Sequence, residues 1–342
     1  MDIDLSRPDQ VGPPLLEHLA GRLGVSDLRF AEPLTAIGHG WDTYIYTFRL
    51  AGDSLDRMWA EPLVLRVFPG ADQGPKAERE AAVQRFVADR GYPAPRPLAV
   101  ETERGPLGRP FMIMEHAPGV PMLDRMAGSP LAALRLAAVM ADAHVALHRL
   151  PVEGFPVPAE GPLVERQLAA ARHDISQLGL RELEEPLRWL EEHKQVVAPE
   201  ERSVIHNDFH PLNILVGERG QITVIDWPDA TVGDRHNDIA STLVLIRTAP
   251  VDSGSLSERL LTRFGRGLVV WRYLSRYRSQ LPIDRERLRY WEAARALNRW
   301  GLMAVFQSGG SAAIGLKPDT AQRVPPEQLA LVRRYFWKRA RG

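Results

Sequence analysis

The sequence of 342 residues contains no cysteine, which excludes disulfide bonds, thiolate metal sites and cysteine nucleophiles. It also lacks net charge, because 43 basic residues balance 43 acidic ones, and this argues against a general nucleic-acid or membrane-surface binder. The best apolar run, residues 131–147, is interrupted by Arg135, Asp142 and His144, so no membrane-spanning helix is expected. The polar, acidic start is unlike a signal peptide. We therefore expect a cytoplasmic protein without nucleic-acid or membrane partners, and its oligomeric state stays open.

A loop rich in oxygen-bearing side chains lies between two apolar runs, residues 204–205 and 214–216. It holds Asp208 and Asn213. A polar turn at 217–220 and a third apolar run at 222–225 follow, and Asp226 comes directly after that run. Two short strands joined by a polar turn predict a β-hairpin, with Asp208 and Asn213 at its entrance and Asp226 at its exit. Oxygen ligands beside a base are what Mg²⁺-assisted phosphoryl transfer requires.

The N-terminal third reads as strands with one or two helices. Residues 34–50 predict two strands around a turn that contains Gly38 and Gly40. Such a turn can fold over phosphates, since glycine lets backbone N–H groups approach closely; an ordinary hairpin turn is the alternative. Arg66 interrupts the apolar strand 63–68, and the helical pattern 76–90 offers Glu80. An ion pair between them would explain the arginine; the alternative is a side chain that reaches solvent from a strand end.

Beyond residues 115–119 the pattern changes from strands to helices. We predict an α+β fold with two lobes, a small N-terminal lobe (1–114) with an antiparallel sheet and a larger, mainly helical C-terminal lobe (120–342). The hairpin would belong to the larger lobe, and 115–119 would form the hinge. Ligands favour such domain boundaries.

Four further residues are given structural interpretations. His144 and His148, four apart in a predicted helix, could bind zinc, but the sequence shows no third ligand and we expect no metal there. Asp238, near the start of the next helix, is interpreted as a structural anchor, because a carboxylate suits a helix N-terminus. Asp234 is interpreted as a turn residue.

The ordered motifs resemble a known family. His206-x-Asp208-x-x-x-x-Asn213 followed by Asp226 resembles the catalytic and metal-binding loops of the protein-kinase-like fold. The stretches VIHNDFHPLNILV and VIDWPDATVGD resemble the aminoglycoside phosphotransferase (APH)/choline kinase family. IGHGWDT, LVLRVF, ERE and MIMEHAPG match the remaining landmarks of that family in the correct order.

The resemblance implies a phosphotransferase that moves the γ-phosphate of ATP or GTP to a hydroxyl group of a small molecule, an antibiotic or a metabolite. Asp208 would be the base, and Asn213 and Asp226 would hold Mg²⁺. The residues that the resemblance assigns to the nucleotide are Gly38 and Gly40 over the phosphates, Arg66 on the phosphates and paired with Glu80, and the backbone of Glu115 and Ala117 at adenine.

Two departures from protein kinases qualify this expectation. Only a dozen residues separate Asp226 from Asp238, which leaves no room for a long activation segment and argues against a protein kinase. Arg66 replaces the usual lysine; arginine keeps the charge and can hold phosphate bidentately. The alternative, which rests on Arg66 and on the lack of any visible acceptor motif, is a catalytically idle, nucleotide-binding regulatory protein of the same fold.

The acceptor is constrained only by charge. From residue 247 to the end the chain has 19 basic and 7 acidic residues. Aminoglycosides are polycations best held by carboxylates, so we expect them to be poor substrates, and a neutral, aromatic or anionic hydroxyl compound to be preferred. Arginines on the surface are the alternative explanation for this excess. Macrolides, amino alcohols and sugars stay open.

Overall fold

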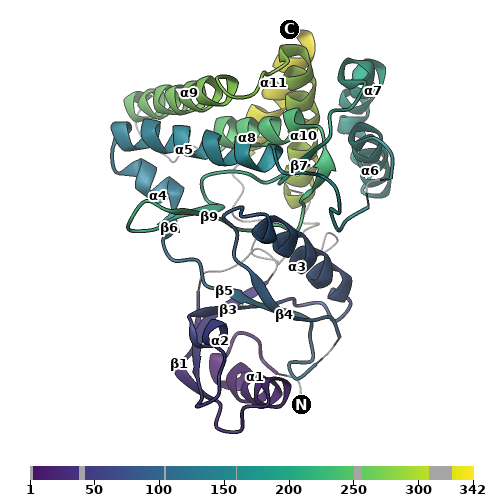
Figure 1. Cartoon of the computed structure of the whole chain (residues 1–342). Helices are drawn as coiled ribbons and strands as arrows, with labels where there is room; N and C mark the ends of the chain where they lie inside the picture. Colours follow the sequence, from purple (N-terminus) through teal and green to yellow (C-terminus); the bar gives the residue numbers. More distant parts are fainter. Residues whose placement is uncertain (1–2, 38–42, 104, 159, 250–255, 308–325) are drawn as a thin grey trace. The chain divides into compact units, whose positions relative to one another are not determined.

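The computed structural model describes residues 3–342 except 38–42, 104, 159, 250–255 and 308–325 (Figure 1). The chain forms two compact units. The first comprises Met1–Pro118 together with Thr223–Pro228, and the second comprises Gly119–Ile222 together with Asp229–Gly342.

The first unit is built on a five-stranded sheet whose pairings are all antiparallel, in the order β1-β2-β3-β5-β4. Its strands are β1 (Arg29–Ala36), β2 (Tyr44–Ala51), β3 (Leu63–Val67), β4 (Pro97–Glu101) and β5 (Phe111–Glu115), and its helices are α1 (Pro8–Leu23), α2 (Arg57–Ala60) and α3 (Gly74–Asp89). In Figure 1 helix α1 lies beside β1, while α3 runs along β4.

The central strand β3 separates two apolar clusters. Side chains alternate between the faces of a strand, so Leu63, Leu65 and Val67 enter the large cluster that also contains the buried residues of α1. The opposite face carries Phe68, Met112 and the buried alanines of α3. Arg66, which lies opposite Met112 in the β3–β5 register, is therefore directed toward the face that α3 covers.

Residues 223–228 belong to the first unit, although the sequence-based division placed the whole hairpin in the second lobe. The Val224 N–H donates to the carbonyl of Pro93 at 2.7 Å. The indole of Trp227 is fully buried, donates to the Val224 carbonyl at 3.0 Å and meets the ring of Tyr92 edge to face. These contacts fix the backbone on both sides of Asp226.

The second unit is mainly helical. Its helices are α4 (Met122–Ala127), α5 (Pro130–His148), α6 (Leu163–Gln177), α7 (Glu184–His193), α8 (Arg235–Thr248), α9 (Leu256–Arg278), α10 (Arg285–Gln307) and α11 (Pro326–Arg341), with 3-10 turns at Arg181–Leu183 and Lys194–Val197. Helix α10 packs against α8 and α11, and α5 packs along α9 (Figure 1). The predicted fold class, an N-terminal antiparallel sheet followed by a mainly helical remainder, is confirmed.

Four short strands lie in the second unit: β6 (Val120–Pro121), β7 (Ser203–Ile205), β8 (Ile214–Val216) and β10 (Thr231–Gly233). Strand β9 (Ile222–Val224) begins at the last residue of a second-unit segment, and its other two residues belong to the first unit. Strand β8 lies between β6 and β9, so the predicted hairpin is the β8–β9 pair. Strand β7 instead pairs with β10, with Ile205 opposite Thr231. The loop that carries Asp208 and Asn213 thus connects two different sheets.

Helix α5 is the one helix, among the described residues, long and apolar enough by length and composition to cross a membrane. The sequence argument had excluded it because charged residues interrupt the run. In the structure α5 packs against α4 and α9, and the side chains of His144 and His148 are 0 % exposed. The histidine-bearing face of α5 is therefore packed inside the second unit.

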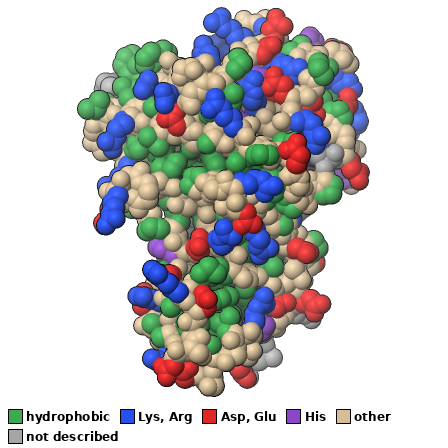
Figure 2. Space-filling model, in the orientation of Figure 1, with side chains coloured by type: hydrophobic (Ala, Val, Ile, Leu, Met, Phe, Trp, Pro, Cys, Tyr) green, Lys and Arg blue, Asp and Glu red, His purple; other side chains and the backbone are tan. Residues whose placement is uncertain are grey.

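Figure 2 shows how charge is distributed on one face of the molecule. Lys and Arg side chains are spread over the helical unit, with Asp and Glu side chains between them. Several arginines of the C-terminal helices are exposed, among them Arg278, Arg285, Arg289, Arg333 and Arg334. Surface arginines therefore account for part of the C-terminal basic excess.

Candidate active site

The loop between β7 and β8 is held by one face of helix α8. The carboxylate of Asp238 accepts the backbone N–H of His206 at 2.6 Å and that of Asn207 at 2.7 Å. The hydroxyls of Ser241 and Thr242 donate to the carbonyls of Asn207 and Phe209 at 2.7 and 2.6 Å. Positions 238, 241 and 242 share one helix face because they are three and four residues apart. The backbone on both sides of Asp208 is therefore fixed.

Asn207 takes a left-handed backbone conformation, with φ at 68°. Asparagine tolerates this region better than most residues. Its side chain is satisfied at both ends, since the amide nitrogen donates to the Asp229 carbonyl at 2.8 Å and the oxygen accepts from Asn237 at 2.7 Å. Asn207 thus supports the turn that presents Asp208.

Asp238 is an anchor, as the sequence suggested, but it does not cap its own helix. Asp234 is the N-cap of α8 and accepts the backbone N–H of His236 at 2.9 Å. It also accepts from Arg287 and from the indole of Trp291, each at 3.0 Å. The interpretation of Asp234 as a turn residue is therefore incomplete, because its carboxylate ties α8 to α10.

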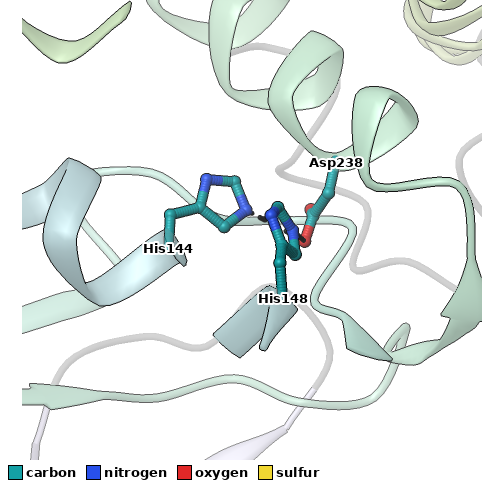
Figure 3. Close-up of side chains that lie close together, drawn as sticks. All are labelled: His144, His148 and Asp238. Carbon is teal, nitrogen blue, oxygen red and sulfur yellow. Dashed lines mark hydrogen bonds and ion pairs between the residues drawn. The ribbon is translucent and has the colours of Figure 1, made fainter. Parts of the chain in front are cut away.

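Two histidines of α5 point at Asp238 (Figure 3). His144 Nε2 and His148 Nε2 lie 3.0 and 3.3 Å from Asp238 Oδ2. The other ring nitrogen of each histidine meets a tyrosine hydroxyl of α9 at 2.7 Å, Tyr273 for His144 and Tyr277 for His148. Helices α5 and α9 therefore contact each other here through two histidines four residues apart on α5 and two tyrosines four residues apart on α9.

This cluster brings together the three ligand atoms that a metal site needs, all within 4.8 Å of one another. The sequence missed the third one because Asp238 lies on another helix. Polar contacts nevertheless account for the cluster. Nδ1 of each histidine accepts from a tyrosine, which leaves Nε2–H facing the carboxylate; His148 Nε2 is hydrogen-bonded to it, and His144 Nε2 lies within ion-pair distance. Burial lowers the pKa of His148 to about 3, so its ring is neutral. We interpret the group as hydrogen-bonded support for Asp238.

Two side chains, Asn213 and His210, direct N–H groups at the carboxylate of Asp208. Asn213 Nδ2 donates to Asp208 Oδ2 at 2.9 Å and to the Asp208 carbonyl at 3.0 Å. His210 Nε2 lies 3.3 Å from the same carboxylate oxygen. Because His210 Nδ1 accepts the Leu212 N–H at 3.2 Å, its proton is on Nε2 and points to Asp208. The Asp208 side chain remains 37 % exposed, so it is open to a ligand.

Opposing effects act on the pKa of Asp208. Burial raises the pKa, but the hydrogen bond from His210 and the positive charge near the carboxylate outweigh it, and the net pKa lies below the ordinary value. Arg295 is one source of that charge. The carboxylate is therefore ionised at neutral pH and able to accept a hydrogen bond from a hydroxyl group.

Two arginines of α10 lie near this carboxylate, and the sequence analysis did not single them out. Arg295 donates to the Asn207 carbonyl at 2.6 Å and to the Ser241 hydroxyl at 2.7 Å. Arg299 follows one turn later, and the negative charge of Asp208 favours its charged form. The i, i+4 spacing of two arginines in a helix of buried aromatic residues was the signal that could have identified them.

In the first unit Arg66 joins two carboxylates. Its NH1 lies 2.6 Å from Glu80 Oε1 and 3.1 Å from Asp226 Oδ1. The ion pair with Glu80 expected from the sequence is therefore present, and it is buried, with side-chain exposures of 9 % and 1 %. Asp226 is 40 % exposed and, like Asn207, has a left-handed backbone, with φ at 69°.

The remaining predicted nucleotide-binding residues have mixed outcomes. Glu115 ends β5, and its carboxylate accepts the Arg96 N–H at 2.9 Å. The Ala117 N–H has no acceptor among the described residues, which leaves it available to a ligand. Gly38 and Gly40 lie outside the described residues. The structure thus brings together Arg66, Glu80 and Asp226 in one group, and Asp208 and Asn213 in another.

These features can now be compared with known proteins. The model of the "Phosphotransferase enzyme family", APH, matches residues 33–279, more than half of the chain. The chain belongs to this family, which confirms the resemblance drawn from its motifs.

Curated proteins that are similar to this chain are much longer than it is. Mouse (Mus musculus) acyl-CoA dehydrogenase family member 10 is 28% identical over 243 residues, 66% of this chain and 21% of that protein. Human (Homo sapiens) acyl-CoA dehydrogenase family member 11 is 30% identical over 217 residues, 57% of this chain and 27% of that protein. The similarity therefore spans about a quarter of the length of these relatives.

Solved structures share the fold at low sequence identity. A thermostable mutant of aminoglycoside phosphotransferase APH(4)-Ia, in a ternary complex with AMP-PNP and hygromycin B, has a TM-score of 0.62 at 18% identity and covers 93% of this chain and 98% of its own. The amicoumacin kinase hAmiN, in complex with AMP-PNP, Ca²⁺ and Ami, has a TM-score of 0.55 at 15% identity, with coverages of 90% and 88%. The fold is therefore that of the aminoglycoside phosphotransferases, which is protein-kinase-like.

Proposed function

We propose that this protein transfers the γ-phosphate of ATP or GTP to a hydroxyl group of a small molecule. The observation that carries the proposal is the fixed, ionised carboxylate of Asp208, which lies between Asn213 and His210 in a clamped loop. Membership of the phosphotransferase family supports the same reaction class. Phosphoryl transfer depends on positioning and charge neutralisation more than on covalent chemistry, and a clamped carboxylate supplies the positioning.

In this proposal Asp208 accepts a hydrogen bond from the acceptor hydroxyl and takes its proton as the new P–O bond forms. His210 and Asn213 hold the carboxylate in place, since each directs an N–H group at Oδ2. A strongly raised pKa is not needed, because the hydroxyl proton becomes acidic only late in the transfer. The lowered pKa of Asp208 is compatible with this role.

The donor set suits a magnesium nucleotide. Asn213 uses its amide N–H groups on Asp208, and its oxygen accepts no hydrogen bond from the described part of the chain. Asp226 is 40 % exposed and keeps an oxygen beyond the one that meets Arg66. Carboxylate and amide oxygens are hard ligands that Mg²⁺ accepts. Bound Mg²⁺ would neutralise phosphate charge. Arg66, oriented by Glu80, would contact the phosphates. The backbone of Glu115 and Ala117 would contact the nucleobase. Gly38 and Gly40 remain proposed phosphate contacts.

One observation favours a second candidate, a catalytically idle nucleotide-binding protein. Arg66 is held by two carboxylates at once, including the proposed metal ligand Asp226. An arginine so engaged competes with a cation at Asp226. The two candidates differ in turnover, so a single assay separates them.

The test is release of ADP or GDP across a library of hydroxyl metabolites and antibiotics, with Asp208→Asn as the variant. General-base groups typically contribute about 10²- to 10⁴-fold, so turnover should fall by that order while nucleotide binding persists. Asp174→Asn, an exposed aspartate of α6, is the matched control and should turn over normally. Unchanged turnover in Asp208→Asn would remove Asp208 from the mechanism, and the absence of product from every compound would favour the idle protein.

A further inference from the structure

Arg299 of α10 is a largely enclosed cation without a partner among the described residues. Its Nε atom is buried and makes no hydrogen bond, and the guanidinium has no ion pair among the described residues. Burial lowers the pKa of Arg299, and the charge of Asp208 is what opposes that effect. Burying a charge without a partner is costly, so native proteins pair such groups or use them to bind ligands.

Arg295, the neighbouring arginine of α10, has a structural role that Arg299 lacks. The guanidinium of Arg295, one turn earlier on the same helix face, donates hydrogen bonds to the Asn207 carbonyl and the Ser241 hydroxyl, at 2.6 and 2.7 Å. It therefore braces the loop. Arg299 has the same helix and the same charge but no such contacts, which makes it available to something outside the chain.

Asp208 does not satisfy Arg299 by itself. Its Oδ2 already receives Asn213 and approaches His210, and no ion pair joins it to Arg299 among the described residues. In the proposed reaction Asp208 must also receive the acceptor hydroxyl. The partner that Arg299 lacks is therefore best supplied by the molecule that brings this hydroxyl.

We propose that Arg299 binds a negatively charged group of the acceptor, a carboxylate or a phosphate monoester, so that the substrates of this protein are hydroxylated anions. This inference rests on the proposed phosphotransferase function and names its substrate class. Guanidinium groups are suited to both anions because their donors form a planar fork. Polycationic acceptors are disfavoured for the same reason, since they would place like charge beside Arg299.

The experiment compares matched acceptors. Hydroxy carboxylates and hydroxylated phosphate monoesters of several chain lengths are assayed beside the primary amides of the same acids and beside amino alcohols. We expect the anions to be phosphorylated and the amides and amino alcohols to be poor. Because hydroxy carboxylates and hydroxylated phosphate monoesters are assayed separately, the comparison shows which of the two anions the site prefers. Equal kcat/KM for acid and amide, or efficient phosphorylation of kanamycin, would overturn the inference.

Variants then assign the effect to Arg299. In Arg299→Gln the KM for the best anion should rise on the order of 10- to 100-fold, as for loss of a hydrogen bond to a charged group, while the KM of its amide should change little. Arg299→Lys should recover part of the loss because it restores the charge. Arg285→Gln, an exposed arginine of the same helix, is the control and should behave as wild type. A rise in the KM for ATP instead would assign Arg299 to the donor phosphates and refute the proposal.

Failure of the reaction itself is distinguished by binding. If wild-type protein turns over none of these compounds, the proposed function fails, and calorimetric titration without nucleotide decides the inference alone. Anions that bind the wild type, and bind Arg299→Gln on the order of tenfold more weakly, would sustain the anion site. Anions that bind neither protein, or both equally, would overturn it.

Discussion

The two groups of polar residues proposed to act in phosphoryl transfer are held in place by different means. In the second unit, Asp208 is presented by a loop whose backbone N–H groups are clamped by a buried carboxylate, Asp238, itself supported by two histidine–tyrosine pairs. In the first unit, Asp226 and Glu80 are held by the charge of one arginine in the middle of a sheet. The arrangement in the second unit fixes the backbone of a loop, whereas the arrangement in the first unit fixes side chains.

This difference has consequences for stability and for pH. A clamp on backbone N–H groups leaves unsatisfied donors when it is lost, which costs more than the loss of one contact. An arginine shared between two carboxylates keeps one partner when the other is removed. Loss of the buried carboxylate of the second unit, or acid, should therefore lower the free energy of unfolding strongly. Loss of one carboxylate of the first unit should lower it moderately.

The largest effect is expected for Asp238→Asn. The amide retains the shape of the side chain but loses the charge and points an N–H group at a backbone donor, so the free energy of unfolding should fall by about 3–5 kcal/mol. Chemical denaturation measures this change. Asp174→Asn, which is exposed, is the control and should stay within about 0.5 kcal/mol of wild type. A loss below about 1 kcal/mol would contradict the role given to Asp238.

Acid should destabilise the second unit through His148. Burial lowers the pKa of His148 in the folded protein from 6.5 to about 3. Between these values the unfolded chain binds a proton that the folded chain does not, so the free energy of unfolding falls as the pH drops, by about 5 kcal/mol in total. Asp238, whose pKa lies well below 3.8 despite burial, adds a further loss below that pH.

Denaturation curves between pH 7 and pH 4 measure this slope. His148→Gln should show a shallower dependence than wild type, since glutamine does not titrate. His173→Gln, at an exposed position of α6, should keep the wild-type slope. The same slope in all three proteins would show that His148 is not responsible.

A smaller effect is expected for Glu80→Gln in the first unit. Arg66 would lose its closest partner but keep Asp226, so we expect a loss of about 1–3 kcal/mol rather than unfolding, together with a higher KM for ATP. Glu78→Gln, exposed on the same helix, is the matched control. A loss as large as that of Asp238→Asn would remove the contrast between the two groups.

The smallest effect is expected for Asp142→Asn. The ion pair of Asp142 with Arg276 is exposed on both sides, at 43 % each, and Gln280 donates to the same carboxylate. Such a pair is screened by water and salt, so the change should stay within about 0.5 kcal/mol. A loss above about 1 kcal/mol, measured by denaturation at low and high salt, would mean that exposed pairs on α5 contribute as much as the buried ones.

Local patterns in the sequence predicted most of the fold. The apolar patterns at 63–68, 76–90 and 131–147 located β3, α3 and α5 to within a few residues, because these elements bury one face or are wholly buried. The pairing of β7 with β10 was not predictable, since a three-residue strand carries too little pattern to choose a partner. The Arg66–Glu80 pair was predictable because an arginine inside an apolar strand requires a partner.

The sequence by itself determined the family, and it predicted the loop and the carboxylates that we propose for phosphoryl transfer, because these depend on residue types at fixed spacings along a short stretch. Only the tertiary structure decided how that loop is held and what surrounds it. Asp238 meets His144 across about ninety residues, and Arg299 follows Asp208 by about as many, so no local spacing connects them. Burial then determines their chemistry: it keeps His148 neutral and leaves Arg299 a cation without a protein partner among the described residues.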